Sequence, residues 1–150
     1  MAKARPGTEI RVHVRERARG LCEYCRIDEE STGHEFTLDH VAPESRGGPT
    51  TRENLAYACI GCNVRKSNRT HAPDPIDGEI APLYNPRLDR WRDHFCWSAD
   101  TRLILGLTPS GRATVVVLSL NRPLLIKYRI LMIRNGLHPP SETRYQGQVE

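Results

Sequence analysis

Four of the five cysteines in this chain are paired at the spacing that metal sites use. Cys22 and Cys25 form one Cys-x-x-Cys turn, and Cys59 and Cys62 form a second. Two such turns can supply the four tetrahedral thiolate ligands of a structural zinc ion. Because four sulfurs leave no open coordination position, we expect this zinc to stabilise the fold and not to catalyse. We expect the fifth cysteine, Cys96, to be a small buried apolar residue.

Between the two turns lie side chains that are suited to phosphodiester hydrolysis. Imidazole is the usual general base near neutral pH, and His40 provides one. Asp39 offers a hard oxygen ligand for Mg²⁺, and Asn63 offers a second through its amide oxygen. On its own, an Asp-His pair is also typical of an ion pair at a strand end. Adjacent residues of a flat strand point to opposite faces, so Asp39 and His40 share a site only if the strand ends or twists there.

Basic residues follow the last cysteine and could hold a phosphate backbone. They are Arg65, Lys66 and Arg69, and guanidinium groups suit bidentate phosphate contacts. A basic stretch of this length is also typical of a solvated helix end. The formal net charge of +4 is mild, and four zinc-bound thiolates would add about −2. Charge alone therefore barely indicates a nucleic-acid partner.

The composition is that of a globular domain without a membrane segment. Apolar residues make up 38% and charged residues 27% of the chain, as in ordinary soluble proteins. No apolar run approaches the roughly 18 residues of a transmembrane helix. The N-terminus lacks the apolar stretch of a secretory signal. We therefore expect a cytoplasmic protein with no membrane partner.

Short helices and strands are expected to position these residues. In chain order we expect a helix over 8–19, a loop over 27–35, a strand over 36–41, a capped turn from a Thr50-x-x-Glu53 capping box, a strand over 56–58, a helix over 63–68, two strands within 83–107 and helices over 109–121 and 123–134. Arg11, Arg15 and Arg19 form a basic row on the first helix, either solvated or in contact with phosphate.

The chain divides into three expected parts. Residues 1–72 form a core with an N-terminal helix and a disordered tail over 1–7. Residues 73–82 are rich in proline and glycine and are predicted to form a linker. Residues 83–150 form an extension with a hairpin, two helices and a disordered tail from His138 onward.

Residues 22–66 resemble the HNH endonuclease family in its version with two zinc knuckles. The resemblance rests on C-x2-C, then LDHVAPESRGG, then ENL, then CIGCNVRK. It implies an α+β fold with a ββα-metal HNH core, stapled here by the four-cysteine zinc site and followed by an α/β extension. It further implies that His40 is the general base, Asp39 a metal ligand and Asn54 the residue that fixes the loop and orients His40. Asn63 stands where the family commonly has its last histidine, which favours Mg²⁺ or Mn²⁺ as the catalytic ion.

The leading hypothesis is a metal-dependent endonuclease that hydrolyses DNA phosphodiester bonds, with RNA left open as a substrate and a homodimer compatible with the chain. The alternative hypothesis is a zinc-ribbon module that binds nucleic acid without turnover. A protein-interaction module with a structural zinc is the third.

Overall fold

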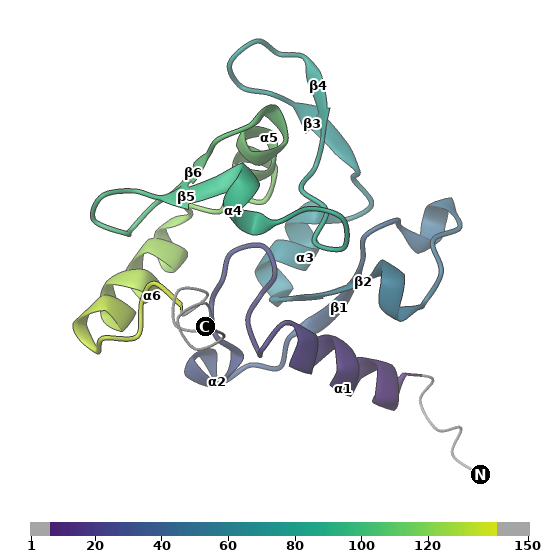
Figure 1. Cartoon of the computed structure of the whole chain (residues 1–150), viewed down its shortest axis with the longest axis horizontal. Coiled ribbons are helices and arrows are strands. Elements are labelled where there is room, and N and C mark those ends of the chain that lie inside the picture. The colour runs from purple at the N-terminus through teal and green to yellow at the C-terminus, as the bar shows by residue number, and fades with distance from the viewer. Residues whose placement is uncertain (1–6, 141–150) are drawn as a thin grey trace.

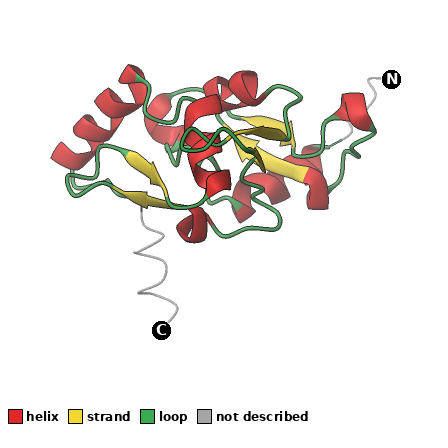
Figure 2. Ribbon diagram, turned by 90° about the horizontal axis from the view of Figure 1, so that it is seen from above, coloured by secondary structure: helices red, strands yellow, loops and turns green. Residues whose placement is uncertain are grey.

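The computed structural model describes residues 7–140, which fold into short helices and small antiparallel sheets (Figure 1). The helices are α1 (Thr8–Arg17), α2 (Glu29–Thr32), η1 (Glu44–Arg46), η2 (Arg52–Asn54), α3 (Ile60–Lys66), α4 (Trp91–His94), α5 (Pro109–Val117) and α6 (Pro123–Arg134). The strands are β1 (Thr37–His40), β2 (Leu55–Ala58), β3 (His71–Pro73), β4 (Ile80–Pro82), β5 (Phe95–Trp97) and β6 (Ile104–Gly106). They pair as β1–β2, β3–β4 and β5–β6 in separate two-stranded sheets, whose strands are yellow in Figure 2. The α+β expectation is confirmed.

Helix α1 packs its basic row onto the protein itself. The helix has Gly7 as its N-cap and ends at Arg17, two residues before the expected end at Arg19. Gly20, which follows, has a φ of +73°, which suits glycine. Arg11 Nη2 donates to the Phe36 carbonyl at 2.7 Å. Arg15 Nε lies 3.0 Å from Glu29 Oε1. These two arginines therefore tie α1 to the segment before β1, and are neither simply solvated nor turned toward a phosphate.

Glu29 holds the segment before β1 in place. It lies within residues 27–35, for which we expected only a loop. It lies in α2, and its carboxylate accepts hydrogen bonds from the Phe36 amide and the Tyr57 hydroxyl. Burial raises the pKa of Glu29, but these donors and the guanidinium of Arg15 outweigh it, so the net pKa shift is downward. Glu29 thus links α1, α2 and the first hairpin as an ionised group.

The β1–β2 hairpin places Asp39 and His40 on a regular strand. Asp39 pairs with Ala56 and His40 with Leu55 across the antiparallel ladder. All residues of β2 are buried. The expected capping box is wrong, because Thr51 is the N-cap of η2 and has no side-chain cap, while the Thr50 hydroxyl binds Glu44 instead.

Glycine is required in the loop between the two strands. A Cβ at Gly48 would lie 1.8 Å from the Ala42 carbonyl oxygen, a distance that no side chain tolerates. Gly47 has a φ of +83°, in the left-handed region that glycine enters at little cost. The pair lets the loop fold back onto the end of β1.

Helix α3 starts at Ile60, three residues before the expected start at Asn63. Its N-cap is Cys59, whose Sγ accepts a hydrogen bond from the Cys62 amide at 3.4 Å. The second Cys-x-x-Cys turn is therefore the first turn of this helix. A sulfur cap is not among the usual capping side chains, which is why the sequence pattern placed the helix too late.

The expected linker is wrong at the level of secondary structure. Within 73–82, Pro73 ends β3 and Ile80 begins β4 of a hairpin that packs beside α5 (Figure 1). Buried Asp74 holds Arg112 of α5 through two parallel bonds, Nε–Oδ1 at 2.9 Å and Nη2–Oδ2 at 2.7 Å. Prolines at the sheet edge cost no ladder hydrogen bonds.

The later elements follow the expected order, but the unexpected helix α4 occupies Trp91–His94 and leaves only Phe95–Trp97 for the strand. β5 and β6 form the expected hairpin. Thr108 caps α5 by accepting from the Gly111 amide at 3.0 Å, although the helix ends at Val117, before the expected Asn121. Helix α6 begins at Pro123 as expected. Cys96 lies half-buried in β5.

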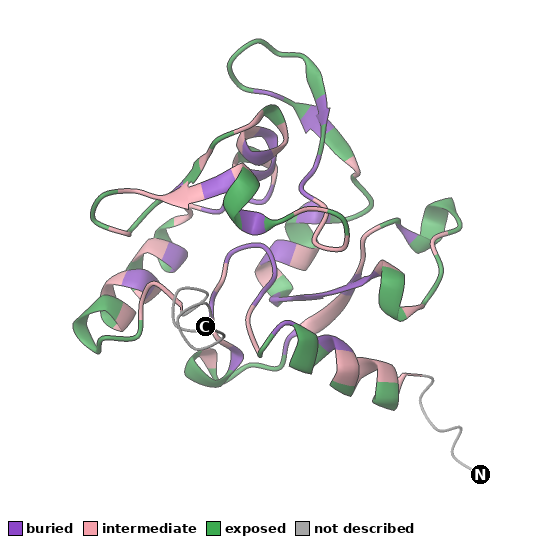
Figure 3. Ribbon diagram, viewed as in Figure 1, coloured by how far each residue is buried: buried purple, intermediate pink, exposed green. Residues whose placement is uncertain are grey.

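One hydrophobic core joins the zinc-knuckle segment to the extension. Its buried members are Val14, Ala18, Cys22, Tyr24, Cys25, Ile27, Phe36, Leu55, Ala56, Tyr57, Ala58, Cys59, Cys62, Tyr84, Trp91, Phe95, Ile104, Leu118, Leu120 and Leu125. Buried stretches of the chain are purple in Figure 3. The Trp91 indole donates to the Tyr24 carbonyl at 3.0 Å, and Arg87 forms an ion pair with Glu23. Side chains from both halves therefore share one interior.

The expected tails fall largely outside the described residues. Residues 1–6 and 141–150 are not described, so those parts of the prediction stay untested. His138 is ordered against the ring of Trp97, at a centroid distance of 4.5 Å, which corrects the expected start of the C-terminal tail. Within residues 7–140, none of the helices combines the length and the apolar character that a membrane crossing requires.

Candidate functional site

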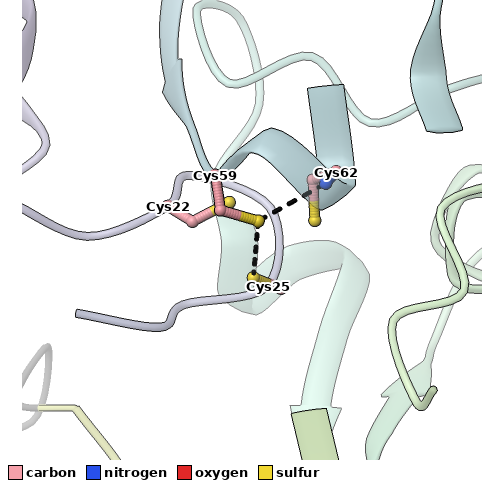
Figure 4. A group of neighbouring side chains, drawn as sticks. All are labelled: Cys22, Cys25, Cys59 and Cys62. Atoms are coloured by element: carbon pink, nitrogen blue, oxygen red, sulfur yellow. Dashed lines mark hydrogen bonds between the residues drawn. The ribbon is translucent and has the colours of Figure 1, made fainter. Parts of the chain in front are cut away.

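The four cysteines of the two Cys-x-x-Cys turns converge on one point (Figure 4). All four are buried, and their Sγ atoms lie within 4.8 Å of one another. Cys25 Sγ and Cys59 Sγ are 3.7 Å apart. A tetrahedral zinc with Zn–S bonds of about 2.3 Å has sulfur–sulfur edges of about 3.8 Å. The residues present therefore fit a structural zinc ion, as the spacing predicted.

The four thiols influence one another's protonation because they are buried together. Burial raises the pKa of the Cys22 and Cys25 thiols. Hydrogen bonds from Cys22, Cys25 and Cys62 lower the pKa of Cys59. A bound divalent cation stabilises all four as thiolates and displaces their protons.

His40 lies at the exposed end of β1, where a short chain of hydrogen bonds holds its ring. Its Nε2 is 2.9 Å from Thr50 Oγ1 and 3.1 Å from Glu44 Oε1. The Thr50 hydroxyl donates to the same Glu44 oxygen at 3.3 Å. The His40 side chain is 22% exposed, so water can reach the ring while its orientation is fixed from the loop.

Asn54 ties that loop together. Its Oδ1 accepts from the Ala42 amide at 2.8 Å. Its Nδ2 donates to the carbonyls of Ala42 and Pro49, both at 2.9 Å. The Asn54 backbone carbonyl also accepts from the Val41 amide at 2.9 Å. Such contacts clamp the two ends of the loop that follows His40.

Asp39 faces away from His40 and into the protein. Its side chain is 2% exposed. Its Oδ2 accepts from the Tyr24 hydroxyl at 2.6 Å, and its Oδ1 from Lys66 Nζ at 3.2 Å. Burial raises the pKa of Asp39, and Lys66 and Tyr24 offset this only in part. Because β1 remains a regular strand through both residues, the strand twist that would unite Asp39 and His40 is not seen.

Asp39 and Asn63 as they lie do not fit a magnesium or manganese site. Both Asp39 oxygens are taken, one of them by the ammonium group of Lys66, which competes with any cation. The Asn63 side-chain amide donates to Thr37 Oγ1 at 2.8 Å. Thr37 lies two residues before Asp39 in β1. Among the described residues, the four cysteines are the group of His, Cys, Asp and Glu side chains that could hold a metal.

Of the three basic residues expected to contact nucleic acid, Lys66 is excluded by burial. It is 2% exposed, and its Nζ donates to the carbonyls of His40 and Val41 at 3.0 and 3.4 Å as well as to Asp39. Arg65 and Arg69 are exposed, and Arg65 Nη1 also contacts the Gly61 carbonyl at 3.0 Å. Lys66 is thus an internal brace of β1.

Sequence reasoning missed the residues that support the site from a distance. Glu44 and Thr50 lie in the loop after His40 but were not recognised as partners of its ring, and Tyr24 lies inside the first Cys-x-x-Cys turn but was not recognised as a partner of Asp39. Arg122 reaches the cysteine cluster from the extension, 60 residues after Cys62. Spacing in the sequence gives no signal for a contact across that many residues.

Comparison with known protein families matches the same segment whose motifs resemble the HNH endonucleases. The model of the HNH endonuclease family matches residues 22–69. No curated protein matches the chain, and neither does any solved structure. The match confirms the resemblance, covers all four cysteines as well as His40 and Asn54, and indicates a nuclease-type enzyme.

Proposed function

We propose that this chain is an endonuclease that hydrolyses DNA phosphodiester bonds, with His40 as the general base. The observation that carries the proposal is the HNH match over residues 22–69, together with an imidazole that is held in place at a solvent-reached strand end. Exposed Arg65 and Arg69 on the neighbouring helix and loop are the proposed phosphate contacts.

The hydrogen-bond chain on His40 selects the ring nitrogen that acts. Because the Thr50 hydroxyl hydrogen points to Glu44, the Thr50 oxygen is left to accept, and the donor to it is His40 Nε2–H. The neutral ring then carries its lone pair on Nδ1. Within residues 7–140 no side chain or backbone group forms a hydrogen bond to that atom. Nδ1 is therefore free to take a proton from an attacking water.

Thr50 and Glu44 also favour the protonated ring that this step creates. The Glu44 carboxylate lies 3.1 Å from Nε2, so it interacts favourably with an imidazolium. Its side chain is 68% exposed, and solvent screening keeps the electrostatic gain small. The main effect of the pair is to fix the orientation and tautomer of the ring, while Asn54 holds the loop that presents them.

The proposal includes a divalent catalytic ion. The family resemblance implies Mg²⁺ or Mn²⁺, which would stabilise charge on the phosphate and leaving oxygen. The sequence predicted Asp39 and Asn63 as its ligands, but the contacts of Asp39 with Tyr24 and Lys66 and of Asn63 with Thr37 do not support that role. Titrating nicking activity against Mg²⁺ and Mn²⁺, for the wild type and for Asp39→Asn, measures the dependence directly.

A nicking assay on supercoiled plasmid tests the proposal. His40→Ala is expected to reduce the rate by about 10²–10⁴-fold, the usual contribution of a general base. The matched control is His34→Ala, which removes an exposed imidazole outside the site. Zinc content and circular dichroism should match the wild type. A His40→Ala protein that nicks at the wild-type rate would end the assignment.

One observation favours the non-catalytic alternative. The closed contacts of Asp39 with Lys66 and Tyr24 are those of a structural residue, as a zinc-ribbon module that only binds nucleic acid would have. Such a module would bind DNA with an affinity that falls steeply with salt, and it would leave the plasmid intact at every Mg²⁺ and Mn²⁺ concentration. Binding and nicking measured on the same preparation separate the two functions.

A further inference from the structure

We propose that Arg122, which lies in the C-terminal extension outside the family match, is a positioning residue for the zinc site. It is the N-cap residue of α6 and is half-buried. Its Nη2 lies 3.7 Å from Cys59 Sγ and 3.9 Å from Cys62 Sγ, and its Nη1 lies 3.8 Å from Cys62 Sγ. The guanidinium group therefore donates to both sulfurs of the second Cys-x-x-Cys turn.

The guanidinium is held in that position by the end of α5. Its Nη1 donates to the carbonyls of Leu118 at 3.0 Å and Ser119 at 3.3 Å. The Arg122 amide also donates to the Ser119 carbonyl at 3.0 Å. Backbone oxygens on one side and sulfurs on the other leave the group little freedom. A side chain fixed this way is built into the site and is not a passing surface contact.

Gly61 supplies the space that this approach needs. A Cβ at position 61 would lie 2.6 Å from Arg122 Nη2 and 3.2 Å from Arg122 Cζ. The absence of a side chain at position 61 thus lets the guanidinium reach the sulfurs of Cys59 and Cys62. The small residue in the second turn and the distant arginine form one arrangement.

The chemistry follows from charge. Four thiolates around Zn²⁺ carry a net charge of about −2 in a buried site, and charge of that sign is costly to bury without a counter-ion. The Arg122 guanidinium group does not lose its proton in proteins, so it brings a fixed positive charge to the sulfurs that it contacts. Its N–H donors stabilise the coordinated thiolates and make the sulfurs less reactive toward electrophiles.

The proposal is tested on the full zinc-loaded chain with Arg122→Met. Zinc affinity is measured by competition with a chromophoric chelator, and sulfur reactivity by the rate of zinc release during alkylation with N-ethylmaleimide. Loss of an outer partner of a metal ligand typically weakens metal binding by about 10–100-fold, and we expect that range with faster release. Arg122→Lys keeps the charge but not the two-sided donor geometry, so it should recover part of the loss.

Two further variants make the outcome decisive. Arg134→Met removes an exposed arginine from the last turn of the same helix and should leave affinity and release unchanged. Gly61→Ala displaces the guanidinium without deleting it, and it should weaken zinc binding even if Arg122→Met does not fold. Wild-type affinity and release rate in Gly61→Ala, or in a folded Arg122→Met protein, would overturn the proposal.

Discussion

Lys66 offers the sharpest test of how this fold is held together. Replacing it with methionine keeps most of the volume and removes the ammonium that binds Asp39 Oδ1 at 3.2 Å and the His40 carbonyl at 3.0 Å. The Asp39 carboxylate, 2% exposed, then has Tyr24 as its remaining donor. Removing one partner of a buried ion pair typically costs about 3–5 kcal/mol. For a domain of this size, we expect a fall in Tm on the order of 10–20 °C.

The assay is urea denaturation of the zinc-loaded protein, followed by circular dichroism. The free energy of unfolding of Lys66→Met is compared with that of Arg65→Met, which removes an exposed cation from the same helix and should change stability by no more than about 0.5 kcal/mol. Burial already raises the pKa of Asp39, and the loss of Lys66 raises it further. A group whose folded pKa is raised favours folding at low pH, so the deficit of the variant should grow as pH rises.

The double variant Asp39→Asn with Lys66→Met completes the cycle. With both charges gone, no buried ion is left unpaired, so the double variant should lose less stability than the two single variants added together. A Lys66→Met cost below about 1 kcal/mol, or strict additivity in the cycle, would refute the view that this pair braces β1.

Three further outcomes are expected. Chelation of zinc should unfold the core, because structural zinc sites contribute on the order of 10 kcal/mol or more; circular dichroism measured before and after adding the chelator checks this, and an unchanged spectrum would contradict it. Thr50→Val should slow plasmid nicking by about 10–100-fold, as small misplacements of a catalytic group do, while Thr51→Val, one residue away and without a capping bond, should nick normally. Because the folded pKa of Glu29 is lowered, its contribution to stability is present above the ordinary glutamate pKa and is lost as pH falls below it; acid titrations should show less of this loss in Glu29→Gln, and identical acid titrations would count against it.

The parts of the site that could be predicted from the sequence are those set by local spacing. Two Cys-x-x-Cys turns need only a tight turn each, so the zinc cluster followed from the pattern of the cysteines. His40 and Asn54 were identified through motifs that lie within one loop and its flanking strands. Both kinds of signal depend on residues that are close in the chain.

The parts that could not be predicted depend on long-range pairing. Lys66 follows the basic pattern of a phosphate-binding helix end, but Asp39, 27 residues earlier, draws it into the interior. Prolines around Asp74 indicated a linker, whereas the ion pair with Arg112, 38 residues later, folds that segment against α5. In each case the deciding partner lies on an element whose position the chain pattern does not fix.

The contacts of the extension with the first Cys-x-x-Cys turn determine which part of the chain could be transferred to another protein. Trp91 donates to the Tyr24 carbonyl, Arg87 pairs with Glu23, and apolar side chains as late as Leu125 belong to the same interior. A fragment of residues 22–69 placed in another protein would expose this hydrophobic core to water. It would also lose the contacts of Trp91 and Arg87 with the first Cys-x-x-Cys turn. A fragment that keeps this core intact therefore has to include α6.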